Sequence, residues 1–383
     1  MHKLMVPFGP AHPALPEPVY LKLFLDGEEI EDVDFSVGYN HKGIEKALEE
    51  TDYFKNVFLS GRICGICSSA HSTCYTLGVE KLLNIEIPDK AKFIRVIVSE
   101  LERLHSHLLW LGLLGHEMGF DTLFMLAFRE REYVLESLEL ITGKRVVHDI
   151  NMIGGVRRDL SHEIMVKLVK NLEILEGKVE YLRKLVRKDS LIRRRTLRIG
   201  KLDKRDVEEL CLVGPVARAS GVLYDIRRAD KYLAYDDLNF KIVTQKKGDA
   251  SARTLVRVRE MLESLRLARL AIAFIEPGPI KVKPFLIFPE KEVISRVEAP
   301  RGELIYYIRS NGTDKPARVK IRTPTYANLI SLKKILVGHT LADVPVAVAS
   351  LDPCLSCTDR VTIVKNGKEK IIKWEDLHDH EHH

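Results

Sequence analysis

Cys64-Gly65-Ile66-Cys67 and Cys354-Leu355-Ser356-Cys357 are two short cysteine pairs that lie near opposite ends of a 383-residue chain. The cysteines of each pair are three residues apart, so one turn of backbone can direct both sulfurs into one pocket. Four thiolates around one centre are the ligand set of a metal site. The chain between the pairs must therefore fold back so that the two pairs meet.

The metal itself is not decided by the ligand type. Thiolates select zinc, copper(I), iron-sulfur clusters or nickel. A zinc ribbon has its two pairs roughly 15 to 20 residues apart, whereas hundreds of residues intervene here, so a functional metal is favoured and structural zinc stays the alternative. The two remaining cysteines, Cys74 and Cys211, have apolar neighbours in the sequence and are expected to be buried core thiols.

The composition indicates a globular protein whose cysteines are reduced. With 45% hydrophobic residues the chain can bury a large core, and cysteine usage favours a cytosolic compartment without disulfides. The net charge is +6, but Lys and Arg alternate with Glu and Asp along helical stretches such as residues 176–184, which is typical of a solvated helix face. We therefore expect no nucleic-acid partner. No apolar run is long enough for a membrane span, so we expect a chain that is neither exported nor membrane-spanning by itself.

The pattern of apolar residues predicts an α+β chain that is mainly α, with a core of long helices and small β elements towards both ends. Residues 1–40 are expected to hold a proline-rich loop (7–18) and a hairpin that turns at Asp26-Gly27. Four regions are expected: 1–40, the helical core 41–285 with the first cysteine pair, a β/α region 286–360 that ends in the second pair, and an extension 361–383. Helices are predicted at 42–51, 52–61, 68–84, 89–118, 121–143, 160–187, 203–210 and 249–275, strands at 21–25, 30–37, 292–297, 304–309 and 318–322, and short helices around 325–336.

Two motifs carry a family resemblance. Arg62-Ile63-Cys64-Gly65-Ile66-Cys67-Ser68-Ser69-Ala70-His71 and Asp352-Pro353-Cys354-Leu355-Ser356-Cys357-Thr358-Asp359-Arg360 resemble the paired motifs of the large catalytic subunit of nickel-iron hydrogenases. The resemblance covers nearly the whole chain, including residues 7–13, 154–159, 213–221, 298–303 and 322–328. It implies the hydrogenase large-subunit fold.

Within that family the chain looks most like the energy-converting, membrane-associated branch and its relative, the 49 kDa-type quinone-site subunit of complex I. Soluble enzymes usually have His where this chain has Arg360. The complex I subunit shares the segments 9–13 and 41–45 but lacks the cysteines. All four cysteines are present here, which favours a working metal centre.

The resemblance implies roles for particular residues. Cys64 and Cys354 would be terminal ligands of nickel, and Cys67 and Cys357 would bridge nickel to an iron that also carries carbon monoxide and cyanide. Glu17 occupies the position of the family's gating glutamate and would be the first proton acceptor beyond the sulfurs; the alternative is a surface carboxylate in a polar loop.

Three further residues are candidates with open alternatives. His71, one helical turn after Cys67, would donate a hydrogen bond to a bridging sulfur, or would be a satisfied core histidine. Arg322 would be the guanidinium over the metal pocket, or would form a salt bridge on the last strand. Glu45 resembles a carboxylate that binds structural magnesium in part of the family, although the usual C-terminal histidine partner is absent.

The resemblance therefore implies the catalytic subunit of an energy-converting nickel-iron hydrogenase on the cytoplasmic side of the membrane. The alternative is a complex I-like quinone-binding or coupling subunit without hydrogenase activity. Expected partners are a small subunit with a 4Fe-4S cluster, a ferredoxin-like subunit, integral membrane subunits and maturation proteins. Residues 361–383 are expected to form a hairpin extension around Asn366-Gly367, which a nickel-dependent protease removes after Arg360 or which stays as a surface hairpin. The histidine-rich end, 378–383, is expected to be a solvated polar tail.

Overall fold

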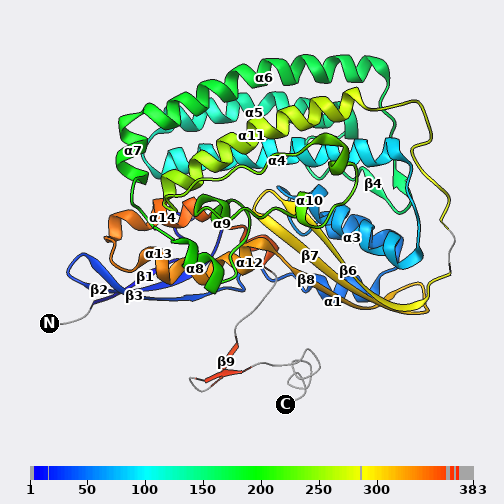
Figure 1. The fold of residues 1–383 in the computed structure, drawn as a ribbon. Coiled ribbons are helices and arrows are strands. Elements are labelled where there is room, and N and C mark those ends of the chain that lie inside the picture. Colours follow the sequence, from blue (N-terminus) through cyan, green and yellow to red (C-terminus); the bar gives the residue numbers. More distant parts are fainter. Residues whose placement is uncertain (1–3, 16, 285–286, 359–362, 366–367, 371–383) are drawn as a thin grey trace.

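Four long helices form the upper layers of the computed structural model (Figure 1), which describes residues 4–15, 17–284, 287–358, 363–365 and 368–370. They are α4 (Asp89–Glu117), α5 (Asp121–Thr142), α6 (His162–Lys188) and α11 (Ala250–Ala273). Helix α4 packs against α5 and α11, and α6 packs against the same two helices from the outside. Helix α4 is therefore the central helix of the bundle, and most of its side chains are buried.

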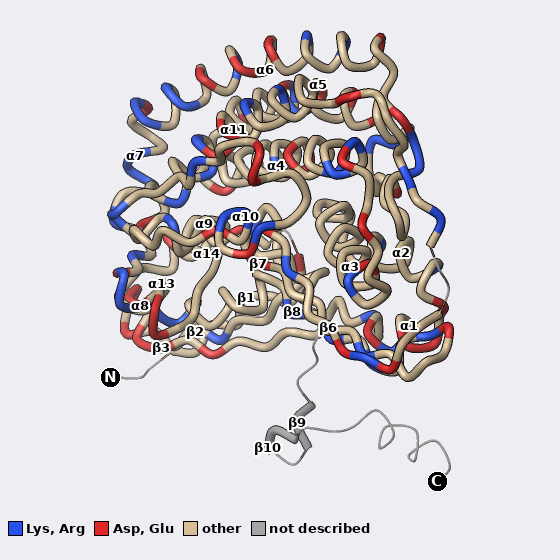
Figure 2. The backbone as a smooth tube through the Cα atoms, turned by 45° about the vertical axis from the view of Figure 1, so that its right-hand side comes forward, with Lys and Arg blue, Asp and Glu red and all other residues tan. Residues whose placement is uncertain are grey.

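The outer helix α6 shows why these segments are helical. Its buried residues recur at intervals of three and four, which places them along one face of a helix. Acidic and basic residues are interspersed along the rest of the helix (Figure 2). Ser161 caps the first turn, because its Oγ accepts a hydrogen bond from the Ile164 amide at 3.3 Å. The mixed charge predicted for residues 176–184 thus lies on a solvated helix face.

The N-terminal sheet consists of β1 (Leu4–Phe8), β2 (Tyr20–Asp26) and β3 (Glu29–Ser36), in that order and all antiparallel. The predicted hairpin at Asp26-Gly27 is confirmed, and Gly27 has the positive φ of 61° that such a turn requires. Strand β1 was not predicted, because Pro7 argues against a central strand. Pro7 fits here because β1 lies at the edge of the sheet and, among the described strands, pairs only with β2.

A second antiparallel sheet, β6 (Glu290–Ala299), β7 (Gly302–Asn311) and β8 (Pro316–Arg322), contains the three predicted strands. Helix α3 (Ser68–Leu83) packs on this sheet (Figure 1), next to α1 (Ile44–Glu50) and α2 (Tyr53–Gly61). The sheet and these helices share one hydrophobic core, and the four paired cysteines belong to it. The chain thus brings its two cysteine motifs into a single buried region.

Shorter elements connect these layers. Helix α14 leads into the second cysteine pair, and the pair ends in the 3₁₀ turn η4. The remaining described elements are β4 (Asn151–Met152), β5 (Gly155–Val156), α7 (Ser190–Thr196), α8 (Lys204–Glu209), α9 (Gly214–Ala219), α10 (Ile226–Ala229), η1 (Tyr235–Leu238), α12 (Pro324–Asn328), η2 (Leu329–Ser331), α13 (Leu332–Leu336), η3 (Leu341–Asp343), α14 (Val344–Leu351), η4 (Leu355–Cys357), β9 (Ile363–Lys365) and β10 (Lys368–Lys370).

The predicted fold class is confirmed, because long helices form the core and small sheets lie near both ends of the chain. The four-region division remains a prediction. Strands β9 and β10 pair antiparallel, as expected of the extension. Arg360, the Asn366-Gly367 turn and the histidine-rich end lie outside the described residues, so processing after Arg360 also remains a prediction. Among the described helices, none combines the length and apolar character needed to cross a membrane.

Candidate metal centre

The four paired cysteines meet in the buried interior. Their sulfurs all lie within 4.8 Å of one another. Cys64 Sγ is 3.3 Å from Cys354 Sγ, and Cys67 Sγ is 3.3 Å from Cys357 Sγ. Each side chain is at most 6% exposed. The predicted meeting of the two pairs is therefore seen in the fold.

The first pair lies in the short connection between α2 and α3. Helix α4 fixes the backbone directly after Cys67. Helix α3 starts directly after Cys67, so its first amides need acceptors. Glu102 of α4 supplies them: its carboxylate accepts hydrogen bonds from the amides of Ser69 at 2.6 Å and Ala70 at 2.8 Å. Arg62, at the start of the motif, forms a two-pronged contact with Asp149 at 2.8 and 3.0 Å.

The second pair follows α14 through Asp352, which has a left-handed backbone with φ of 59°. The Cys354 amide donates to Thr325 Oγ1 at 3.0 Å, and the Cys357 amide donates to the Cys354 carbonyl at 3.2 Å. Lys42 joins the two motifs, because its Nζ donates to the Ile63 carbonyl at 2.7 Å and to the Ser356 carbonyl at 3.4 Å. Both pairs are thus held by contacts from distant parts of the chain.

The cluster favours a thiolate at one position. The pKa of Cys64 is well below its usual value, first because the Cys354 thiol donates a hydrogen bond to its sulfur and then because Cys357 and Cys67 do the same. The pKa values of Cys67 and Cys357 are raised in return. The buried guanidinium of Arg301 adds positive charge beside the sulfurs and lowers the pKa of Cys64 further. Metal binding requires thiolates, so this positive charge favours it.

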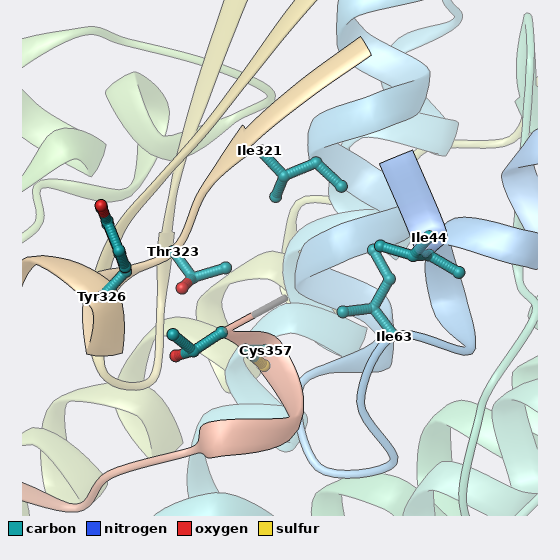
Figure 3. Close-up of a pocket in the computed structure, with 7 residues that line it drawn as sticks. Ile44, Ile63, Ile321, Thr323, Tyr326 and Cys357 are labelled. Atoms are coloured by element: carbon teal, nitrogen blue, oxygen red, sulfur yellow. The ribbon is translucent and has the colours of Figure 1, made fainter. Parts of the chain in front are cut away.

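Two cavities lie beside the cysteine motifs, in addition to a small one around His71 that is described below. The smaller one, about 10 Å³ in volume, is lined by Cys357 together with Ile44, Ile63, Ile321, Thr323 and Tyr326 (Figure 3). In it the Thr323 hydroxyl is buried and has no hydrogen-bond partner among the described residues. The larger one, about 120 Å³, is mainly apolar and is lined by Leu109, Leu113, Leu114, Ile66, Trp110, Ala349 and Pro353, with Glu17, Glu117, Arg301 and Asp352 as its charged members.

Both cysteine pairs lie in segments of the chain that match known protein families. Residues 42–116, which include the first pair, match the family model of nickel-dependent hydrogenases. Residues 117–288 and 285–360, which include the second pair, match that of the 49 kDa subunit of respiratory-chain NADH dehydrogenase. The chain is 40% identical to the membrane-bound hydrogenase subunit alpha of Pyrococcus furiosus, over 97% of this chain and 91% of the relative.

A second curated relative and a solved structure support the same family. The chain is 41% identical to a subunit of the F420H2 dehydrogenase of Methanosarcina mazei, over 94% of this chain and 98% of the relative. The structure matches a chain of the membrane-bound sulfane sulfur reductase, an archaeal respiratory membrane complex, with a TM-score of 0.89 and 33% identity over 94% of this chain and 98% of that one. The chain belongs to the family of nickel-iron hydrogenase large subunits and complex I 49 kDa subunits. The resemblance inferred from its motifs is thereby confirmed.

This hydrogenase-related subunit has Glu17 beside the second cysteine pair. The Glu17 carboxylate accepts hydrogen bonds from the amide and the hydroxyl of Ser356, both at 2.9 Å. Ser356 lies between Cys354 and Cys357, so the carboxylate is anchored to the turn that carries both sulfurs. Glu17 also lines the larger cavity.

His71 of the hydrogenase-related subunit is a buried histidine. Its Nδ1 lies 2.8 Å from the hydroxyl of Tyr306 on β7, and burial lowers its pKa to about 4, so the ring is neutral near pH 7. His71 shares a small cavity with Cys67 and Cys357. The hydrogen bond that the structure describes goes to Tyr306, and the expected one to a bridging sulfur stays a prediction.

Arg322 lines none of these cavities, although its chain neighbours Ile321 and Thr323 line the smaller one. Its Nη1 contacts Glu303 Oε2 at 2.8 Å, which is the salt bridge at the end of β8 given above as the alternative. The guanidinium beside the cysteines belongs to Arg301, which the sequence analysis did not single out. Arg301 contacts Asp352 through Nη2 at 2.7 Å and lines both the larger cavity and the one with His71.

Glu45 lies at the start of α1 and faces β8. Its carboxylate accepts hydrogen bonds from Lys320 Nζ at 2.7 Å and from the Ile321 amide at 3.0 Å. Over the described ranges, the four cysteines are the one group of three or more His, Cys, Asp or Glu residues with ligand atoms close enough for a metal ion. Magnesium at Glu45 therefore stays a prediction.

The remaining two cysteines have different environments. Cys74 is fully buried on α3, as expected. The prediction for Cys211 was wrong, because this residue is exposed. It has a left-handed backbone with φ of 52° just after α8. The apolar residues that follow it are buried, although Cys211 itself is not.

Proposed function

We propose that the chain is the catalytic subunit of a nickel-iron hydrogenase, which interconverts two protons and two electrons with one molecule of dihydrogen. The observation that carries the proposal is the buried cluster of four cysteine sulfurs within 4.8 Å, in a chain of this family. A quinone-binding subunit of the same fold has no need for four buried thiols at this place. Retention of the full ligand set therefore favours metal chemistry.

The residues present fit a nickel-iron group. Four soft sulfur donors suit nickel and iron, and the cluster is shielded from solvent. Two polar groups at its border are suited to hold small ligands of the iron such as cyanide: the unpartnered Thr323 hydroxyl and the Arg301 guanidinium. When bound, the group would supply the site at which dihydrogen is formed or split.

The protein's own part is to carry the proton. Glu17 is held at the second cysteine pair by both hydrogen bonds from Ser356, so a proton on a neighbouring sulfur has a carboxylate oxygen nearby to receive it. Glu17 also borders the larger cavity, which reaches Glu117 near the end of α4. Burial raises the pKa of Glu117, and this makes it a better proton acceptor than a solvated glutamate. Protons would leave Glu17 by way of this cavity and Glu117.

Electrons must come from another subunit. Apart from the four paired cysteines, the described residues contain Cys74 and Cys211, which lie on different elements and are too few to hold an iron-sulfur cluster. We therefore propose a small subunit with a 4Fe-4S cluster, reduced by a ferredoxin-like protein. Integral membrane subunits would hold the complex on the cytoplasmic side of the membrane, and maturation proteins would install the metals.

The experiment is metal analysis of the complex purified from its native host, with infrared spectroscopy and a hydrogen assay. We expect one nickel and one iron per chain, bands of bound carbon monoxide and cyanide, and hydrogen turnover. Cys64→Ser should abolish the nickel and the turnover, whereas Cys74→Ser, which changes another buried thiol on α3, should keep both. Zinc alone, or a complex without nickel that turns over a quinone, would refute the proposal.

A further inference from the structure

The end of α14 is held by side chains from two other helices. The last carbonyls of a helix have no partner within the helix, and here the second cysteine pair follows three residues later. The Ala349 carbonyl accepts a hydrogen bond from Trp110 Nε1 at 2.7 Å. Arg257 of α11 donates to the next two carbonyls, of Ser350 at 3.2 Å and of Leu351 at 3.1 Å. Three successive carbonyls are thus fixed from outside the helix.

The fixed stretch continues into the motif itself. Arg301 Nε donates to the Asp352 carbonyl at 2.8 Å, and Arg301 Nη2 donates to the Asp352 carboxylate at 2.7 Å. Pro353 has no amide hydrogen to satisfy, and the Cys354 amide donates to Thr325 Oγ1. From residue 349 to Cys354, each residue other than Pro353 therefore has a backbone hydrogen bond to a distant side chain.

Arg257 is the member of this set that spans two carbonyls. It is fully buried and its guanidinium lies over the ring of Trp110, 4.4 Å from the ring centroid. Its Nε is 3.9 Å from the Asp352 carboxylate, which is too long for a hydrogen bond, and within the described part of the chain it has no other partner. Burial lowers its pKa to about 10, so it stays charged near pH 7. The terminal N–H groups of the Arg257 guanidinium thus donate to backbone carbonyls and not to the neighbouring Asp352 carboxylate.

The first cysteine pair is fixed from the same side. Glu102 of α4 caps α3 directly after Cys67, and Trp110, eight residues later on α4, supports Arg257 and α14. The bundle core therefore carries a support for each pair: an acceptor for the helix that begins after the first pair, and donors for the helix that ends before the second.

We propose that Arg257 is a positioning residue for the metal centre: by fixing the carbonyls of Ser350 and Leu351, it sets where Cys354 and Cys357 stand relative to the first pair. The proposal rests on the metal-binding role proposed above. Its consequence is that Arg257 governs how tightly the four sulfurs hold a metal, without touching the metal or a cysteine. Lysine keeps the charge but cannot present two parallel donors, so it is the informative replacement.

Arg253, one turn earlier on α11, provides a matched control. It is equally buried, but its donors go to the Ser350 hydroxyl and to the carbonyls of Gly248 and Gly200, so it does not hold the carbonyls that lead into the second pair. Arg253→Lys should therefore lower Tm much as Arg257→Lys does. If the two variants differ in how they bind a metal, the difference then reflects the position of the second cysteine pair and not a general loss of stability.

The test uses the complex from nickel-starved cells, titrated with Co²⁺, whose thiolate complexes absorb in the near ultraviolet. For Arg257→Lys we expect the Co²⁺ Kd to rise roughly tenfold or more, which is the usual effect of losing a group that orients metal ligands, together with a shifted thiolate absorption band. Arg253→Lys should keep the parent Kd and spectrum. In the nickel-loaded complex, the infrared bands of Arg257→Lys should also shift.

Two results would overturn the inference: a parent-like Kd and spectrum in Arg257→Lys, or equal changes in both variants. A parent complex that binds no Co²⁺ would overturn it as well, because the four sulfurs would then not form a metal site. Failure of the hydrogenase proposal alone looks different. The complex would show no nickel and no hydrogen turnover, yet Co²⁺ would still bind through four thiolates and the two variants would still differ.

Discussion

Replacing Glu298 by glutamine should remove a large pH-dependent part of the subunit's stability. Glu298, at the end of β6, belongs to a buried ionic cluster in the bundle core, in which its carboxylate contacts Arg218 Nη1 at 2.7 Å. Asp225 in the same cluster contacts the guanidiniums of both Arg227 and Arg218. The cluster contains four carboxylates and three guanidiniums, from Glu100, Asp225, Glu260, Glu298, Arg103, Arg218 and Arg227.

The excess negative charge resides at Glu298, because Asp225 has two cationic partners and Glu298 has one. Burial, followed by the nearby charge of Asp225, raises the pKa of Glu298 from 4.5 to about 7. A pKa difference of about 2.5 between the unfolded and the folded state is worth about 3 kcal/mol. The group is 4% exposed, so solvent screening reduces this value little.

The sign follows from which state holds the proton. Below about pH 4.5, Glu298 is protonated in both states and its contribution to stability is fully present. Between pH 4.5 and 7 the unfolded chain loses the proton while the folded chain keeps it, so the free energy of unfolding falls as pH rises. Above about pH 7 the carboxylate is ionised in both states, and the contribution is lost.

The assay is denaturant unfolding of the purified subunit at several pH values between 5 and 8, followed by tryptophan fluorescence. Glutamine resembles the protonated carboxyl group, so the difference in unfolding free energy between Glu298→Gln and the parent should shift in favour of the variant by about 2 to 3 kcal/mol over this range. Titrating groups that do not interact with Glu298 cancel in the difference. A difference that stays constant with pH would refute the assignment of the proton to Glu298.

Two further substitutions test contacts at the cysteine pairs. Glu17→Gln should stop proton exchange while nickel and iron contents stay at parent values, because glutamine keeps an acceptor for Ser356 but cannot take up a proton; full hydrogen evolution in this variant would exclude the role. Lys42→Met should lower the free energy of unfolding by about 2 kcal/mol, because it removes the donor shared by the Ile63 and Ser356 carbonyls. Lys46→Met, on the exposed side of α1, is the control and should change the denaturant midpoint little; equal losses in both variants would contradict the bridging role of Lys42.

Much of the helical core follows from local sequence. In α6 the apolar period of three to four residues and the Ser161 cap are both local signals, and the observed ends lie within two residues of the predicted range. Helix α14 was not predicted. Its valines favour strands, and the groups that satisfy its last carbonyls, Trp110 and Arg257, are far away in sequence. Tertiary contacts decided its conformation.

The cysteines could be predicted because their spacing within each pair is a local property. The guanidinium beside them could not. Arg301 lies in the turn between β6 and β7, and Arg322 is the last residue of β8 in the same sheet. Only the folded chain reveals that Arg301 contacts Asp352 while Arg322 pairs with Glu303. The same holds for Glu102, whose role as a cap for α3 depends on helix packing. A carboxylate on a long helix gives no local signal of this function.

The separation of the two pairs sets an order of events during synthesis. Cys64 and Cys354 are 290 residues apart, and at typical rates of translation about 15 to 60 s pass between them. During this time the first pair exists without its partners, and helices α4 to α11 are made before the second pair appears. The four-sulfur site can close only after Cys357 has been synthesised. A metal held by all four sulfurs would then close a loop of 290 residues between Cys64 and Cys354, and in a chain-entropy description such a link would stabilise the folded state by about 6 kcal/mol.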